Sequence, residues 1–158
     1  MSTAVQADAM AELLAEKHCR EAVLAAARAV DAQDYAALVA LFTEDATLVR
    51  PGGEPLQGKA AILASYASKS PDRLTCHVVS NHSVQLQGTD LAVSQCTVQL
   101  YATDKRAPLT ARGRAAEPVV LLGQIADRLV RTGQGWRIQE RRAWFDMHLS
   151  PGAAAPNT

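Results

Sequence analysis

Histidine is the residue type of this chain best suited to proton transfer, because a neutral imidazole is a base matched to neutral pH. Neither an H-E-x-x-H motif nor a Cys/His cluster is present, so the sequence predicts no metal site. A single histidine can equally be a hydrogen-bonded core residue, and residue type alone does not decide between the two. The histidines are His18, His77, His82 and His148, of which we interpret His18 and His82 as surface residues and His148 as structural or exposed.

The alternation of a strand suggests which side chains could surround one histidine. If residues 74–87 form a regular strand, His77, Val79 and Asn81 share one face, and His82 points the other way. We expect Asn81 to donate a hydrogen bond to a substrate oxygen.

Two further kinds of side chain could complete a site. Arg131 and Arg142 would steady a developing negative charge if either turns inward. Tyr35 and Trp144 are candidates for the lining of an apolar pocket. A bulge in the last strand would reverse which of its side chains point inward, so their orientation stays open.

The three cysteines give no sign of nucleophilic chemistry. Cys19, Cys76 and Cys96 are an odd number without C-x-x-C spacing, which is typical of reduced, buried thiols in a cytosolic protein. None lies in a recognisable catalytic motif.

The first part of the chain is predicted to be helical. Residues from about 8 to 32 are rich in Ala, Leu, Glu and Arg, contain no Pro or Gly, and repeat apolar positions every three to four residues. Asp34 is expected to be the N-cap of a second, short helix through Phe42. A third helix is predicted over about residues 59–67, ahead of Pro71.

The remainder changes to the period of strands. The polar segment 104–117 reads as a long loop, and 133–135 as a hairpin turn. Strands are predicted over residues 46–50, 74–87, 91–103, 118–132 and 136–149.

Helices followed by a meander define an α+β fold. We expect a curved antiparallel sheet with three N-terminal helices packed on one face, forming a cone that encloses a pocket. The predicted organisation is a flexible N-terminus (residues 1–7), a single domain (8–149) and a disordered tail (150–158).

Composition restricts the partners. The 158-residue, 16.8 kDa chain carries 16 basic and 16 acidic residues and is 48% hydrophobic, as expected of a globular domain. Balanced charge argues against a nucleic-acid or membrane-surface partner. Asp127 and Arg128 are interpreted as strand-surface charge. The early residues do not look like a signal peptide, and no apolar run is long enough to span a membrane, so a cytoplasmic location is expected.

Several short segments, in their order and spacing, resemble the SnoaL-like branch of the nuclear-transport-factor-2-like superfamily. The resemblance spans about residues 10–148 and implies the cone fold with a pocket. It does not give the reaction, because one fold hosts many functions. The segments are 29–38 (AVDAQDYAAL), 41–46 (LFTEDA), 58–62 (GKAAI), 77–81 (HVVSN), 123–131 (GQIADRLVR) and 135–138 (GWRI).

The resemblance also suggests a site. Scytalone dehydratase and hexachlorocyclohexane dehydrochlorinase carry an aspartate and a histidine at positions that fall on Asp31 and His77, implying a base dyad. A further histidine of the dehydratase would fall near residues 100–102, where this chain has Tyr101. The general-base aspartate of ketosteroid isomerase would fall on Arg50, which argues against steroid isomerase chemistry.

These observations predict a lyase or isomerase that transfers protons on a small, largely apolar molecule without a cofactor. Two alternatives remain: a non-catalytic ligand-binding or assembly module of the same fold, and a structural partner resembling the β-subunit of a ring-hydroxylating oxygenase. In either alternative, Asp31 would cap or be solvated and His77 would be structural.

A homodimer is also predicted. In this superfamily the open sheet face commonly packs on its twin, and residues 119–122 are a continuous apolar run of the kind found in sheets covered on both faces.

Overall fold

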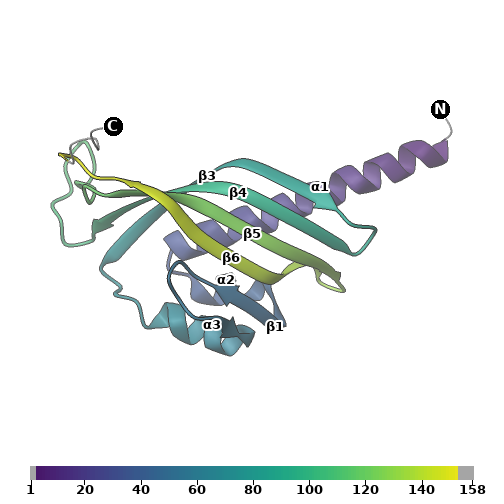
Figure 1. Ribbon diagram of the computed structural model, residues 1–158, viewed down its shortest axis with the longest axis horizontal. Helices are drawn as coiled ribbons and strands as arrows, with labels where there is room; N and C mark the ends of the chain where they lie inside the picture. Colours follow the sequence, from purple (N-terminus) through teal and green to yellow (C-terminus); the bar gives the residue numbers. More distant parts are fainter. Residues whose placement is uncertain (1–2, 153–158) are drawn as a thin grey trace, which may run out of the picture.

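The computed structural model describes residues 3–152, with side chains described from Val5 onward. Helices cover one face of a six-stranded, strongly curved sheet (Figure 1). The predicted α+β architecture is therefore confirmed. The elements in chain order are α1 (Thr3–Asp31), α2 (Tyr35–Ala40), β1 (Phe42–Val49), β2 (Leu56–Gln57), α3 (Gly58–Ala67), β3 (Arg73–Leu86), β4 (Leu91–Asp104), β5 (Val120–Thr132) and β6 (Gly135–Leu149).

The long helix α1 begins earlier than predicted. Residues 3–7, which we expected to be flexible, continue the helix, because nothing in this Ala-rich stretch breaks it. The second half of α1 packs across the sheet, whereas the first half projects beyond it (Figure 1). Consequently Met10 and Leu13 on the projecting half are exposed, at 56% and 62%.

The two short helices begin and end close to the predicted positions. The Asp34 carboxylate accepts a hydrogen bond from the Ala37 backbone N–H (2.9 Å) and caps α2, as the sequence predicts. Helix α3 starts at Gly58 and lies against β1 and α2. Together with α1, these helices close one face of the sheet.

The sheet contains the predicted meander and one pairing that was not predicted. Its strand order is β2-β1-β6-β5-β4-β3, and β3 to β6 are antiparallel neighbours. Strand β1, however, pairs with β6 in parallel, with Thr47 opposite Glu140. Strand β1 begins at Phe42, directly after α2, and runs in the same direction as β6. The sheet is therefore mixed, with one parallel pair at this edge.

Bulges interrupt the β3–β4 pairing once and the β5–β6 pairing twice. The register shift between Ser80 and Ser83 inserts a residue in β3, and the shifts opposite Leu122/Gly123 and Arg128/Leu129 of β5 each insert a residue in β6. Each bulge increases local twist and reverses which side chains face the helices. These interruptions decide which predicted site residues point inward.

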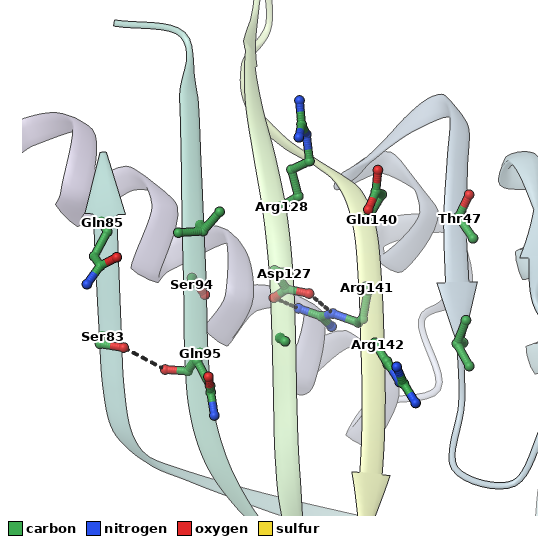
Figure 2. A pocket seen from close by; sticks show the side chains of 13 residues that line it. Thr47, Ser83, Gln85, Ser94, Gln95, Asp127, Arg128, Glu140, Arg141 and Arg142 are labelled. Carbon is green, nitrogen blue, oxygen red and sulfur yellow. Dashed lines mark hydrogen bonds and ion pairs between the residues drawn. The ribbon is translucent and has the colours of Figure 1, made fainter. Parts of the chain in front are cut away.

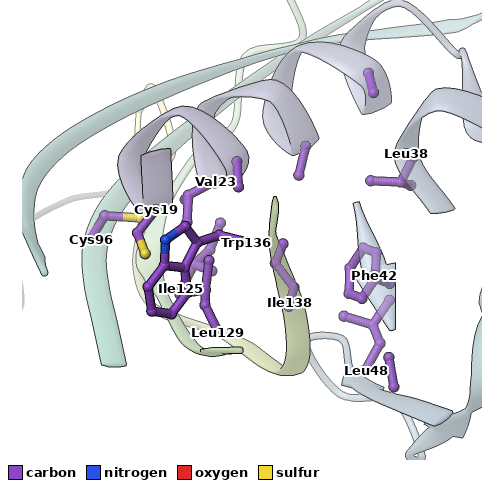
Figure 3. Close-up of a cluster of buried hydrophobic side chains, with 14 of the residues drawn as sticks. Cys19, Val23, Leu38, Phe42, Leu48, Cys96, Ile125, Leu129, Trp136 and Ile138 are labelled. Carbon is purple, nitrogen blue, oxygen red and sulfur yellow. The ribbon is translucent and has the colours of Figure 1, made fainter. Parts of the chain in front are cut away.

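The hydrophobic core lies between the helices and the inner face of the sheet (Figure 3). Full burial of one such side chain contributes about 1.5–3 kcal/mol, so this layer holds the helices over the cavity. The largest fully buried side chains are Phe42, Leu38, Leu48, Ile62, Leu129, Ile138, Val23, Cys19 and Cys96.

The described residues end in a turn at residues 151–152, after β6. The rest of the segment 150–158, for which we predicted disorder, lies outside the described residues. Within residues 3–152, no helix combines the length and the apolar character that crossing a membrane requires.

Candidate active site

Asp31 and His77 are in direct contact. The His77 Nδ1 atom lies 2.5 Å from the Asp31 Oδ1 atom, and the His77 backbone N–H donates to Oδ2 at 2.8 Å. Thr75, two residues earlier on the same face of β3, donates its hydroxyl to Oδ1 at 2.8 Å. The carboxylate is thus held at both oxygens.

The position of Asp31 makes this arrangement unusual for a helix. As the last residue of α1, it places a negative charge where the helix dipole is also negative, which is unfavourable. Partial burial would raise the pKa of Asp31. Its hydrogen bonds with the His77 side chain and backbone, and with Thr75, outweigh that effect and hold the pKa below its ordinary value.

The contact fixes the orientation of the imidazole. An ionised carboxylate only accepts hydrogen bonds, so Nδ1 carries the proton in the neutral ring and Nε2 keeps its lone pair. His77 lines the inner cavity, between the helices and the sheet, whereas Asp31 does not line it. Asp31 therefore stands behind the imidazole, and the basic nitrogen is available to a molecule in the cavity.

This cavity has a volume of about 500 Å³ and lies between the helices and the inner face of the sheet. Its wall is predominantly apolar, and the aromatic rings of Tyr35 and Tyr66 lie 5.6 Å apart on one side of it. Space of this size suits a molecule of one or two rings. Apolar lining residues include Ala26, Ala27, Val30, Leu48, Val98, Leu100, Ile125, Ala143 and Phe145.

A buried ion pair lies in the wall beside the cavity. Arg141 donates two hydrogen bonds to Asp127, each 2.7 Å long, and both side chains are almost completely buried. Burial would lower the pKa of Arg141, but Asp127 outweighs this and raises it. The prediction that Asp127 is a surface charge was wrong, because Asp127 alternates with the buried Ile125 and Leu129 along β5 and faces inward with them.

The predicted lining residues divide into three groups. Tyr35 lines the cavity, as expected. Trp144 also contributes to its wall, although its indole N–H donates to Asp146 (2.9 Å). Val79 packs against the core next to the cavity.

Asn81 does not point inward, and the prediction for it was wrong. The bulge between Ser80 and Ser83 breaks the alternation, and Asn81 adopts a positive φ of 47° with an exposed side chain. His82 takes the inward position instead, with Nε2 3.2 Å from the Ser94 hydroxyl. Burial and nearby Arg20 lower the pKa of His82.

Three other predicted residues lie away from the cavity. Tyr101 is 37% exposed and donates to Gln99 at 3.1 Å. Arg131 is exposed near the β5–β6 hairpin. Arg142 faces the opposite side of the sheet from Arg141, because neighbouring strand residues alternate.

A shallower hollow of about 690 Å³ crosses the sheet face turned away from α1 (Figure 2). Exposed polar side chains such as Gln85, Gln95, Arg128 and Arg142 border it. It is the larger of the two spaces. The Asp31–His77 pair, however, lies at the inner cavity, which is therefore the candidate site.

The cysteines differ partly from expectation. Cys19 and Cys96 are buried, but Cys76 is exposed, because its position on β3 alternates with Thr75 and His77. Burial, assisted by Glu16 for Cys19 and by Asp127 for Cys96, raises the pKa of both buried thiols to about 11. Neither is therefore an activated nucleophile.

Sequence reasoning did not identify Thr75, Tyr66, Lys69 or Arg141 as site residues. Thr75 could have been found, since it lies two residues before His77 on a strand. The others are brought to the cavity by α3 and by the bulged β6. Among the side chains described by the structure, no group of three or more His, Cys, Asp or Glu could hold a metal ion.

The fold and the cavity define an α+β cone with a ligand-sized pocket. Residues 11–142 match the model of the SnoaL-like domain, and the chain belongs to this family. Among proteins with curated functions, none matches this sequence significantly.

Solved structures show the same fold. An NTF2-like protein with a cystatin-like fold from Novosphingobium aromaticivorans is 20% identical, with a TM-score of 0.76, covering 97% of this chain and 93% of its own. A candidate scytalone dehydratase from the same organism is 18% identical, with a TM-score of 0.73 and coverages of 94% and 95%. A type 2 hexachlorocyclohexane dehydrochlorinase is 12% identical, with a TM-score of 0.75 and coverages of 94% and 99%.

Proposed function

We propose that this protein is a cofactor-free proton-transfer enzyme of the lyase or isomerase type, acting on a small, largely apolar molecule. The single observation that carries the proposal is the 2.5 Å contact between Asp31 and His77 at the cavity. A solvated aspartate or a purely structural histidine would not require a carboxylate held by three hydrogen bonds behind an imidazole that faces an apolar space.

The proposed step begins at His77. Its Nε2 atom removes a proton from a carbon of the substrate, and Asp31 stabilises the imidazolium that forms. The electron pair of the broken C–H bond then forms a double bond. In an elimination a leaving group on the neighbouring carbon departs with its bonding electrons; in an isomerisation the proton returns at another carbon.

Structural neighbours described as a candidate dehydratase and a dehydrochlorinase agree with this reaction class. A non-catalytic binding module remains the second candidate, supported by the predominantly apolar cavity itself. The two differ in whether a bound molecule exchanges protons.

The test uses cyclic ketones and β-hydroxy ketones of one and two rings, incubated with the protein in D₂O and followed by proton NMR. We expect deuterium uptake or loss of water with at least one compound. His77→Gln should slow it about 100-fold or more, the usual contribution of a general base. His18→Gln, an exposed histidine on α1, is the matched control and should leave the rate unchanged. An undiminished rate in His77→Gln would exclude the mechanism.

We also propose that the chain forms a homodimer through the sheet face turned away from α1. Apolar side chains remain uncovered on or near this face, including Val78 at 43% and Val119 at 38% exposed. A partner that covers them would remove this area from water.

A cytoplasmic location fits the absence of a membrane-spanning helix among residues 3–152 but rests on the cysteine pattern.

A further inference from the structure

Two cationic side chains border the cavity around one aromatic ring. The Arg50 guanidinium lies 5.2 Å from the centre of the Tyr66 ring, and the Lys69 ammonium lies 4.4 Å from it. Arg50 follows β1 and also donates to the Ser65 hydroxyl; Lys69 follows α3. Both line the cavity into which His77 faces.

The other charges at the cavity are already paired. Arg73 binds Glu117 outside it (3.2 Å), and Arg141 binds Asp127. In contrast, neither Arg50 nor Lys69 forms an ion pair with any residue that the structure describes. No Asp or Glu within the described range lines the cavity.

Lys69 shows the electrostatic cost of placing cations together without a counter-charge. The residue as a whole is exposed, but its ammonium end lies against Tyr66, where water is partly excluded. This burial, together with the like charges of Arg50 and Arg73, lowers the pKa of Lys69 to about 8. A fold that needed only stability would not gather cations without a counter-charge, and such groups are typical of ligand sites.

We infer that the substrate carries a carboxylate on its apolar body and that Arg50 and Lys69 bind this carboxylate. The planar guanidinium matches a carboxylate with two parallel hydrogen bonds, and Lys69 adds a point charge. The apolar cavity wall accommodates the rest of the molecule. Such binding would place an organic acid in the same space as His77 Nε2.

This inference deepens the proposed function by naming the substrate class, and it rests on that function only in treating the bound molecule as a substrate. Binding needs no turnover. The binding test can therefore succeed while the proton-exchange test fails, and the reverse. The two outcomes identify which of the two proposals is wrong.

The test compares 1-naphthoate with 1-naphthamide, which has nearly the same shape and no charge. Affinities are measured by isothermal titration calorimetry at low salt. We expect wild type to bind the acid at least tenfold more tightly than the amide, because the acid forms charge-assisted hydrogen bonds. Arg50→Gln and Lys69→Met should each reduce this preference about tenfold. Their affinity for the amide, which reports an intact cavity, should stay within about twofold.

Matched controls are Arg112→Gln and Lys105→Met, which remove exposed cations that do not line the cavity. Both should keep the preference for the acid. Equal affinity of wild type for the two probes would overturn the inference. So would a preference that persists in Arg50→Gln and Lys69→Met. Inorganic phosphate that displaces 1-naphthoate at equal concentration would also overturn it, because the apolar body would then contribute nothing.

Discussion

The Asp31 carboxylate ends a helix whose dipole opposes its charge, and the hydrogen bonds that the structure describes for it come from β3. Both its oxygens accept hydrogen bonds from the segment 75–77. The residue therefore joins α1 to β3 and orients His77 in one contact. Its charge is a structural requirement of the pair.

This arrangement predicts a pH-dependent effect of Asp31→Asn. Because the pKa of Asp31 is lowered in the folded state, its ionised form adds stability above the unfolded pKa of about 4, and this stability is lost as pH falls through the folded pKa. At pH 7 we expect the variant to lose about 1–3 kcal/mol, the usual worth of hydrogen bonds to a charged group.

The measurement is urea unfolding of both proteins at pH 7, 5 and 3. The difference between them should be smaller at pH 3 than at pH 5, because pH 3 lies below the unfolded pKa of about 4 and the stability that the ionised Asp31 adds is being lost there. A difference that does not change between pH 5 and 3 would show that the charge contributes nothing.

At the scale of residues, the sequence alone predicted only part of the candidate site. Asp31 and His77 were chosen through resemblance, since no spacing rule links a helix end to a strand so far along the chain. Asn81 was misplaced because a bulge inserts a residue without a visible signal. Arg50 was noted only as a departure from a relative's base, and its part in the cavity appears once β1 and α3 are placed.

At the scale of elements, the β5–β6 pairing depends on a glycine. A Cβ atom added at Gly123 would lie 2.0 Å from the Trp144 carbonyl oxygen and 2.8 Å from the Phe145 Cα atom. Backbone atoms cannot move aside as a side chain can. The bulge at Leu122/Gly123 thus requires a residue without a side chain.

Gly123→Ala is therefore expected to force the two strands apart and to lower the free energy of unfolding by about 2–3 kcal/mol, as overpacking typically does. Gly133→Ala is the matched control, because nothing lies within 4 Å of its added Cβ atom, and it should change stability by less than about 0.5 kcal/mol. Urea unfolding at pH 7 measures both. Similar values for the two variants would contradict the close approach.

The main helix and strands could be predicted from the sequence because their hydrophobic patterns extend over many residues. The Ala-rich helix and the meander strands of β3–β6 extend over many residues with one period. The two-residue strand β2 and the parallel pairing of β1 were not predicted, since short contacts between distant segments leave no local pattern. The inward orientation of Arg141 depends on a bulge in β6 that the sequence does not mark, whereas that of Asp127 follows the regular alternation of β5 and could have been predicted.

At the scale of the whole molecule, two surfaces that carry exposed apolar side chains are candidates for the dimer interface. One is the sheet face that carries Val78, and the other is the projecting half of α1 with Met10 and Leu13. We propose the first, because the sheet face is broad whereas the helix is narrow and isolated (Figure 1).

Light scattering at micromolar concentration should therefore give a dimer for the wild type. Val78→Glu should give a monomer, because a charge would be buried in the interface. Leu13→Glu is the control and should remain a dimer. A monomeric wild type would exclude the dimer, and dissociation of Leu13→Glu alone would assign the interface to α1.

The parallel pairing of β1 with β6 has a consequence for synthesis of the chain on the ribosome. Thr47 emerges early, but its partner Glu140 lies in the last strand. The segment that bears Arg50 therefore has no neighbouring strand in the meander until translation is nearly complete, and the cavity cannot close before then. Helix α1, which ends with Asp31, packs mainly on β3 in the middle of the sequence, so the wall that holds His77 can form before the wall that holds Arg50.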